Sequence, residues 1–158
     1  MTRLFLKTPS GRKRFNVLGA LDFATRDVVT LTNVTYITST TVCELLQLLT
    51  VQNLGIPLTL VLDNARYQRC RLVQDLAAQL GIELLFLPSY SPNLNLIERL
   101  WKFVKGNCLN GKYYETFEEF QRSIETCMSQ LTSEHRSAMK TLLTRNFQLF
   151  DEKTFLQV

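Results

Sequence analysis

In the first forty residues, the pattern of apolar and polar positions predicts β-strands. Residues 2–7 alternate weakly between apolar and polar positions, which predicts a short strand. Residues 15–23 are largely apolar, and residues 28–37 are rich in Val, Thr and Tyr. A turn at Arg26 and Asp27 separates these two segments, so together they predict an antiparallel hairpin.

The middle of the chain alternates between helical and strand-like patterns. A capping box that begins at Thr41 precedes an apolar stripe and predicts a helix to about residue 53. Residues 58–62 form a continuous apolar run, as expected for a strand buried on both faces. A helix beginning near residue 65 and stopped by Gly81 follows, and residues 82–87 predict a second buried strand.

Three further helices are expected after the loop at residues 88–92. The first runs from about Leu94 to Gly106, the second begins at a capping box on Thr116, and the third covers residues 134–147. Two strands followed by alternating helices and strands predict a mixed α/β layered domain.

The length and composition of the chain limit the kinds of protein that it can be. With 158 residues, 46% of them hydrophobic, the chain is long enough for one core, so we expect a single domain over residues 1–158 with a helical C-terminal part at 112–158. No apolar stretch approaches the roughly 20 residues that span a bilayer, and no signal peptide is recognisable. We therefore expect a cytoplasmic protein. The net charge of +4 fits an anionic partner such as nucleic acid.

The four cysteines are widely spaced and contain no Cys-x-x-Cys pair. They stand beside a single histidine, His135, so a structural zinc site is not expected. We expect Cys43, Cys70, Cys108 and Cys127 to be free thiols, most of them buried among apolar side chains.

Asp63 follows the apolar run of residues 58–62, at the carboxyl end of a predicted strand. Ligands of open α/β sheets bind at that end. An Asp directly after a strand is also a common cap for the next helix, here expected near Ala65. The spacing alone leaves both interpretations open.

Glu98 stands three residues after Asn95, which is capping-box spacing at the start of a predicted helix. Helical geometry also sets Glu98 on one face with Lys102 and Lys105, opposite the apolar stripe. A carboxylate on a basic face suits a metal ion that holds a phosphate. The alternative is an ordinary exposed ion pair, worth about 0.3–0.5 kcal/mol.

Two sequence strings surround these acids: Val-Leu-Asp-Asn-Ala at 61–65, and Leu-Pro-Ser-Tyr-Ser-Pro-Asn-Leu-Asn-Leu-Ile-Glu-Arg-Leu-Trp-Lys at 87–102. Between Asp63 and Glu98 lie 34 residues. Together with residues 11–23, these features resemble the catalytic domain of DDE/D transposases. The resemblance is to the bacterial insertion-sequence branch related to mariner-like elements, within the ribonuclease H-like superfamily.

The chain departs from that family's pattern at several positions. The family commonly has Pro at the positions of Ser89 and Leu96, and often His at that of Gln68, but none of these changes removes a carboxylate. The family's first aspartate lies on a strand upstream of the hairpin, and residues 1–9 contain no acid. Asp22 ends an apolar strand, and we interpret it as the end of the hairpin rather than as the missing ligand.

The resemblance implies a ribonuclease H-like mixed sheet with flanking helices, its first, central strand missing or replaced. It also implies DNA cleavage and strand transfer with two Mg²⁺ or Mn²⁺ ions, for which Asp63 and Glu98 would be catalytic metal ligands. The basic residues that would contact DNA phosphates, or otherwise remain ordinary solvated charges, are Arg12, Lys13, Arg14, Arg99, Lys102 and Lys105.

No helix-turn-helix pattern precedes Met1, so the sequence suggests an N-terminally truncated transposase. We expect it to act on element-end and target DNA in the bacterial cytoplasm, associated with the nucleoid and without a membrane. It would act as a homodimer or with a chain that supplies the N-terminal part. The alternatives are an inactive remnant that binds DNA or dimerises, and a different ribonuclease H-like nuclease.

Overall fold

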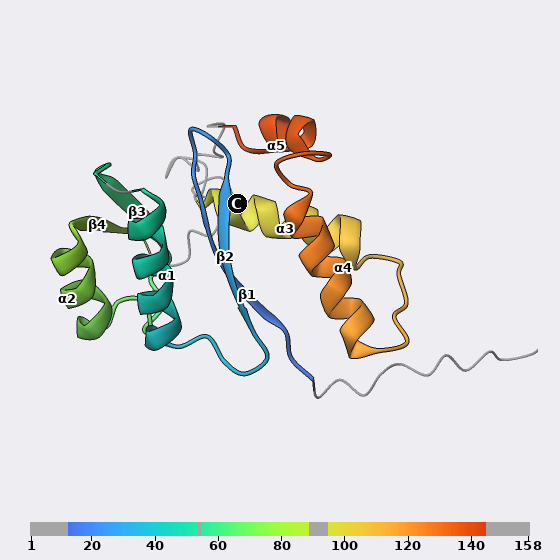
Figure 1. Ribbon diagram of the computed structural model, residues 1–158, viewed down its shortest axis with the longest axis horizontal. Helices are drawn as coiled ribbons and strands as arrows, with labels where there is room; N and C mark the ends of the chain where they lie inside the picture. The colour runs from blue at the N-terminus through green and yellow to red at the C-terminus, as the bar shows by residue number, and fades with distance from the viewer. Residues whose placement is uncertain (1–12, 54, 89–94, 145–158) are drawn as a thin grey trace, which may run out of the picture.

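The predicted antiparallel hairpin is present near the middle of the molecule. The computed structural model describes residues 13–53, 55–88 and 95–144. In it, β1 (Asn16–Leu21) pairs with β2 (Val28–Asn33) along its whole length (Figure 1). The hairpin prediction is confirmed, with strands shorter than the sequence pattern indicated. The strand expected at residues 2–7 lies outside the described residues.

Asp22 closes the turn of this hairpin. Its Oδ1 accepts hydrogen bonds from the backbone N–H groups of Ala24, at 2.6 Å, and Thr25, at 3.0 Å. Its own backbone N–H donates to the carbonyl of Asp27 at 2.9 Å. An Asp that bonds the backbone two and three residues on is a common turn device. Asp22 therefore marks the hairpin end, as predicted.

The hairpin lies between two helical layers (Figure 1). Because successive strand residues point to opposite faces, Leu18 and Ala20 pack with α1 (Ser39–Gln52) while Val17 and Leu21 pack with α3 (Leu96–Cys108). Both faces of β1 are therefore covered by helices.

A parallel β–α–β unit packs on the same α1. β3 (Leu58–Leu62) pairs with β4 (Ile82–Phe86), and α2 (Arg71–Leu80) connects them. The helices α1 and α2 cover the face that carries Leu58, Leu60 and Ile82. On the other face Val61 and Leu85 remain 42% and 52% exposed. The prediction of strands buried on both faces is therefore wrong, because the described helices cover only one face of this pair.

Two helices begin at other residues than the sequence predicted. The N-cap of α1 is Thr38, whose capping-box partner is Thr41, so the helix starts earlier than expected. The start of α2 is later, at Arg71 instead of near Ala65, and Cys70 is its N-cap. The chain first turns at Ala65, whose carbonyl accepts the backbone N–H groups of both Gln68 and Arg69. That turn delays the helix.

The two strand pairs form two separate sheets, β1–β2 and β3–β4. Both pack on α1, since Leu18 of β1 shares its apolar clusters with Leu58 and Leu60 of β3. Within the described residues, β1 and β3 each pair on one edge only.

The C-terminal half adds three helices on the far side of the hairpin. They are α3, α4 (Phe117–Ser129) and α5 (Arg136–Leu142), and their shared core contains Leu100, Ile124 and Met139. The predicted cap of α4 is confirmed, since Thr116 accepts the Glu119 N–H at 3.2 Å. The helix α5 is shorter than the predicted 134–147, and residues beyond 144 lie outside the described part.

The mixed α/β class with flanking helices is confirmed by these elements. Of the described thiols, Cys127 is buried while Cys43 and Cys70 are half-buried. The Cys108 side chain lies outside the described part. None of the helices in that part is long and apolar enough to cross a membrane.

Candidate functional site

Asp63 is joined directly to the start of α3. Asn95 is the N-cap of that helix, and its side-chain oxygen accepts the Ile97 N–H at 3.3 Å. Its side-chain Nδ2 donates to Asp63 Oδ1 at 2.6 Å. One amide thus caps α3 and holds the carboxylate that follows β3. This bond was not foreseen from the sequence, although both residues lie in the strings that carry the family resemblance.

The capping interpretation of Asp63 is wrong. The helix that follows β3 is capped by Cys70, well beyond Asp63 in the chain. Asp63 is half-buried, and the side-chain bond that the structure gives it goes to Asn95. The Asp63 carboxylate therefore does not cap the next helix; it binds the Asn95 side chain at the start of α3.

Glu98 lies in the first turn of α3, half-buried. Its backbone N–H bonds to the Asn95 carbonyl at 3.1 Å, while the Asn95 side chain caps the Ile97 N–H instead. A carboxylate in a first turn is favoured by the helix dipole. Among the residues that the structure describes, no ion pair joins Glu98 to Lys102. The alternative of an exposed i,i+4 pair is thus not formed.

The structure links Asp63, through Asn95, to the helix that carries Glu98. Asp63 contacts the N-cap of α3, and Glu98 stands one turn into the same helix. Carboxylate oxygens are the ligands that Mg²⁺ prefers. Across residues 13–53, 55–88 and 95–144, however, no group of three or more His, Cys, Asp or Glu side chains is placed to hold an ion.

Tyr67 is a neighbour of this site that sequence reasoning missed. Burial raises the pKa of its phenol, and the negative charge of Asp63 raises that pKa further. The electrostatic effect of Asp63 on this phenol places the two side chains near each other. A Tyr four residues after the acid was the available signal, but the expected helix had assigned it to an apolar face.

Gln68 stands where the family often has His. Its side chain is only 7% exposed, and its Oε1 is buried without a hydrogen-bond partner among the described residues. Next to it, Arg69 Nη1 donates to Asn64 Oδ1 at 3.1 Å, which braces the loop after β3.

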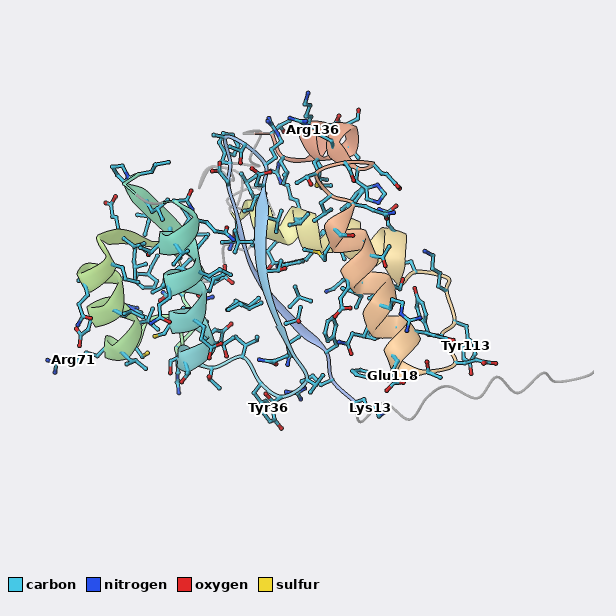
Figure 2. The ribbon with its side chains drawn as sticks, viewed as in Figure 1. Lys13, Tyr36, Arg71, Tyr113, Glu118 and Arg136 are labelled. Carbon is cyan, nitrogen blue, oxygen red and sulfur yellow. The ribbon has the colours of Figure 1, made fainter. Side chains whose placement is uncertain are left out.

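The N-terminal basic residues contact other parts of the chain. The Lys13 ammonium lies 3.6 Å from a carboxylate oxygen of Glu118 and 5.3 Å from the centre of the Phe117 ring, and Figure 2 shows Lys13 and Glu118 extending toward each other. The Arg14 guanidinium lies 4.5 Å from the Tyr36 ring centre. Both cations are exposed, and Arg12 lies outside the described residues.

The basic residues of α3 divide into two kinds. Arg99 is half-buried, and its Nη1 donates to the carbonyls of Leu142, at 3.4 Å, and Thr144, at 2.9 Å. It thereby fastens α3 to the end of α5. Lys102 and Lys105 are exposed along the same helix, and they remain available to an external anion.

Comparison with known proteins gives a family match and two structural likenesses. A family model described as DDE superfamily endonuclease matches residues 2–121. Among curated proteins, none matches the chain. The catalytic domain of Mos1 mariner transposase is similar with 13% identity and a TM-score of 0.48, over 88% of this chain and 82% of that one.

The second likeness is to a chain of the simian T-cell lymphotropic virus intasome, seen by electron cryo-microscopy in complex with PP2A regulatory subunit B56 gamma. Its identity is 16% and its TM-score 0.48, over 77% of this chain and 42% of that one. This chain thus spans less than half the length of the viral one.

Proposed function

We propose that this chain, which belongs to the DDE superfamily endonuclease family, is the catalytic domain of a transposase that cleaves DNA and joins the freed strand to a target. The bond from Asn95 to Asp63 carries the proposal. It sets the carboxylate after β3 against the turn of α3 that bears Glu98. Such cleavage sites need carboxylates delivered from separate elements to one point.

Asp63 and Glu98 would hold divalent cations, Mg²⁺ or Mn²⁺, since carboxylates are hard oxygen donors. Bound there, the ions would supply activated water and charge stabilisation at a phosphodiester. The side chains of this protein would position the metal-binding carboxylate and the DNA. Asn95 orients Asp63, and the exposed ammonium groups of Lys102 and Lys105 would attract DNA phosphates.

The described residues hold only part of the donor set that two ions require. The proposal rests on two carboxylates, and no cluster of three acidic, histidine or cysteine side chains occurs within the described part of the chain. We therefore assign no step of cleavage to ions bound by these residues alone.

The unpaired edges of β1 and β3 indicate where a partner would contribute. Both strands pack on α1, and within the described residues neither edge pairs with a further strand. A free edge of N–H and C=O groups is a template for another strand. We propose that the chain acts as a homodimer, or with a chain that supplies an N-terminal part, and that the added strand brings the third carboxylate.

A catalytically inactive remnant that binds DNA or dimerises is the second candidate. A non-catalytic copy would also carry only two of the carboxylates, and within the described residues it would show the same pairing of β1 and β3 on one edge. In either case the chain would act on bacterial DNA, in the cytoplasm and away from membranes.

Nicking of a supercoiled plasmid that carries element-end DNA, with Mn²⁺, separates the candidates. We expect no nicks from the chain alone, and nicks after addition of an upstream-encoded segment that contains an apolar strand with an Asp. Asp63→Asn and Glu98→Gln should abolish these nicks. Asp75→Asn should not, because Asp75 is a 60% exposed carboxylate whose partner is Arg71 on the same helix.

The other outcomes decide between the candidates. If no added segment restores nicking, the remnant interpretation holds. If the chain alone nicks the plasmid and Asp63→Asn abolishes that activity, the third acid lies within the chain, and Asp22 is the first residue to replace. Nicking that survives both Asp63→Asn and Glu98→Gln would overturn the proposed site.

A further inference from the structure

A cavity of about 90 Å³ lies where the β1–β2 turn meets the connection between α4 and α5. The turn contributes Thr25, Arg26 and Asp27 to its lining, and the helical side contributes Thr132 and Arg136. Figure 2 shows Arg136 at the start of α5, beside the closed end of the hairpin. None of these residues belongs to the site around Asp63.

Arg26 has an unsatisfied donor at this cavity. Its Nε is buried and has no hydrogen-bond partner among the described residues. A buried N–H without an acceptor is unfavourable, so the described residues leave one donor of this guanidinium unsatisfied. Arg26 also has a φ of +67°, in the left-handed region that glycine adopts more readily. The chain thus keeps a guanidinium at a position where glycine would be less strained.

The charges around the cavity favour an anion. The charged residues that line the cavity are Arg26, Arg136 and Asp27, so the lining carries an excess of one positive charge. Within the described residues, neither arginine forms an ion pair. The Thr25 hydroxyl oxygen accepts the Asp27 N–H at 3.2 Å, so its own proton remains for donation. Guanidinium forks beside hydroxyl groups are typical of phosphate recognition.

We propose that this cavity binds a phosphate group, with Arg26 and Arg136 as the donors. A cavity needs only about 10–15 Å³ to hold one water molecule, so this cavity of about 90 Å³ has room for a tetrahedral oxyanion. One excess positive charge matches the single negative charge of a phosphodiester better than the charge of roughly −1.5 to −2 on a phosphate monoester. The expected source is therefore the DNA backbone, an assignment that rests on the proposed function.

The test uses the full chain and two small probes, dimethyl phosphate and inorganic phosphate, in titrations followed by NMR at constant ionic strength. Arg26→Gly removes the guanidinium at a position whose φ suits glycine, so the variant should remain folded. We expect it to weaken dimethyl phosphate binding about tenfold. Asp27→Asn should strengthen the binding of inorganic phosphate. Lys140→Gln, with an exposed cation on α5 that does not line the cavity, is the matched control and should change neither.

A second measurement identifies the source of the phosphate. Binding of a short DNA duplex, followed by fluorescence anisotropy across a salt series, should weaken in Arg26→Gly, with a salt slope lower by about one. If the small probe needs Arg26 but DNA does not, the phosphate site stands and its assignment to DNA is overturned. If folded Arg26→Gly binds dimethyl phosphate as well as the parent chain, the site itself is overturned. Failure of plasmid nicking would leave the small-probe result untouched, so the two proposals fail separately.

Discussion

Asn95 donates its side-chain N–H to Asp63 Oδ1 across 2.6 Å, joining residues 32 positions apart. The same side chain accepts the Ile97 N–H and starts α3. A carboxylate on one element and a helix on another are thus held by one amide group.

Asn95→Ala should lower the free energy of unfolding by about 2–3 kcal/mol. It removes an N-cap, worth about 1 kcal/mol, and a hydrogen bond to a charged group, worth about 1.5–3 kcal/mol. Asn95→Ser is the matched variant, because serine keeps a cap oxygen but cannot reproduce the amide N–H that reaches Asp63. Urea denaturation of the three chains separates the two contributions. A serine variant as stable as the parent would show that the Asp63 bond adds no net stability.

Gly19→Ala should destabilise the fold by about 1–3 kcal/mol, the usual cost of overpacking a core. A Cβ at Gly19 would lie 3.0 Å from Trp101 Cη2 and 3.1 Å from Cζ2, against the rigid ring that packs on β1. Gly106→Ala is the control. It lies inside α3 with open space around its Cβ, so it should stabilise by about 0.5–1 kcal/mol. Opposite signs in thermal denaturation confirm the close approach, and equal signs contradict it.

The Tyr67 phenol should titrate above the ordinary tyrosine pKa of about 10. Burial is the main cause, and the charge of Asp63 adds to it. The raised pKa means that the folded state favours the protonated phenol. The contribution of this preference to the free energy of unfolding is complete below the unfolded-state pKa near 10, and it is lost as pH rises through the folded-state pKa. Ultraviolet difference titration of the parent chain against Tyr67→Phe isolates this phenol. Asp63→Asn should lower the Tyr67 pKa part of the way, and no movement would contradict the proximity of the two groups.

Arg99→Met should destabilise the chain by about 1–3 kcal/mol, because the half-buried carbonyls of Leu142 and Thr144 lose a charged donor. Methionine retains much of the aliphatic stem, so the loss reports hydrogen bonding more than packing. Arg122→Met on α4 is the matched control, since Arg122 is exposed, and its effect should stay within about 0.5 kcal/mol. Equal effects of the two substitutions on the urea midpoint would show that the hydrogen bonds of Arg99 to these carbonyls do not stabilise the fold.

Arg26→Gly should raise the free energy of unfolding by about 1 kcal/mol, because a non-glycine residue at a φ of +67° is strained. Arg26→Asn should recover part of that gain, since asparagine tolerates the left-handed region better than arginine does. Thermal denaturation without phosphate measures both. If the glycine variant is less stable than the parent, the Arg26 side chain stabilises the fold by more than the backbone strain at this position destabilises it.

Predictions from the sequence succeeded where the governing interactions are local. The caps at Asn95 and Thr116 and the stop at Gly81, whose φ is +70°, were all readable from a few neighbouring residues. The start of α2 was not, because the turn at Ala65 and the burial of Gln68 oppose a helical pattern that the residue types alone would allow.

The sequence by itself determined the α/β character, the hairpin, and the helix caps at Asn95 and Thr116. Each depends on backbone sterics, hydrophobic periodicity or a motif within a short stretch of chain. Only the tertiary structure decided that Asp63 is held by Asn95, that Arg99 bonds two distant carbonyls, and that the described helices cover one face of the β3–β4 pair and leave Val61 and Leu85 exposed. These features depend on which distant segments pack together, and side-chain hydrogen bonds and burial follow from that packing rather than from local propensity.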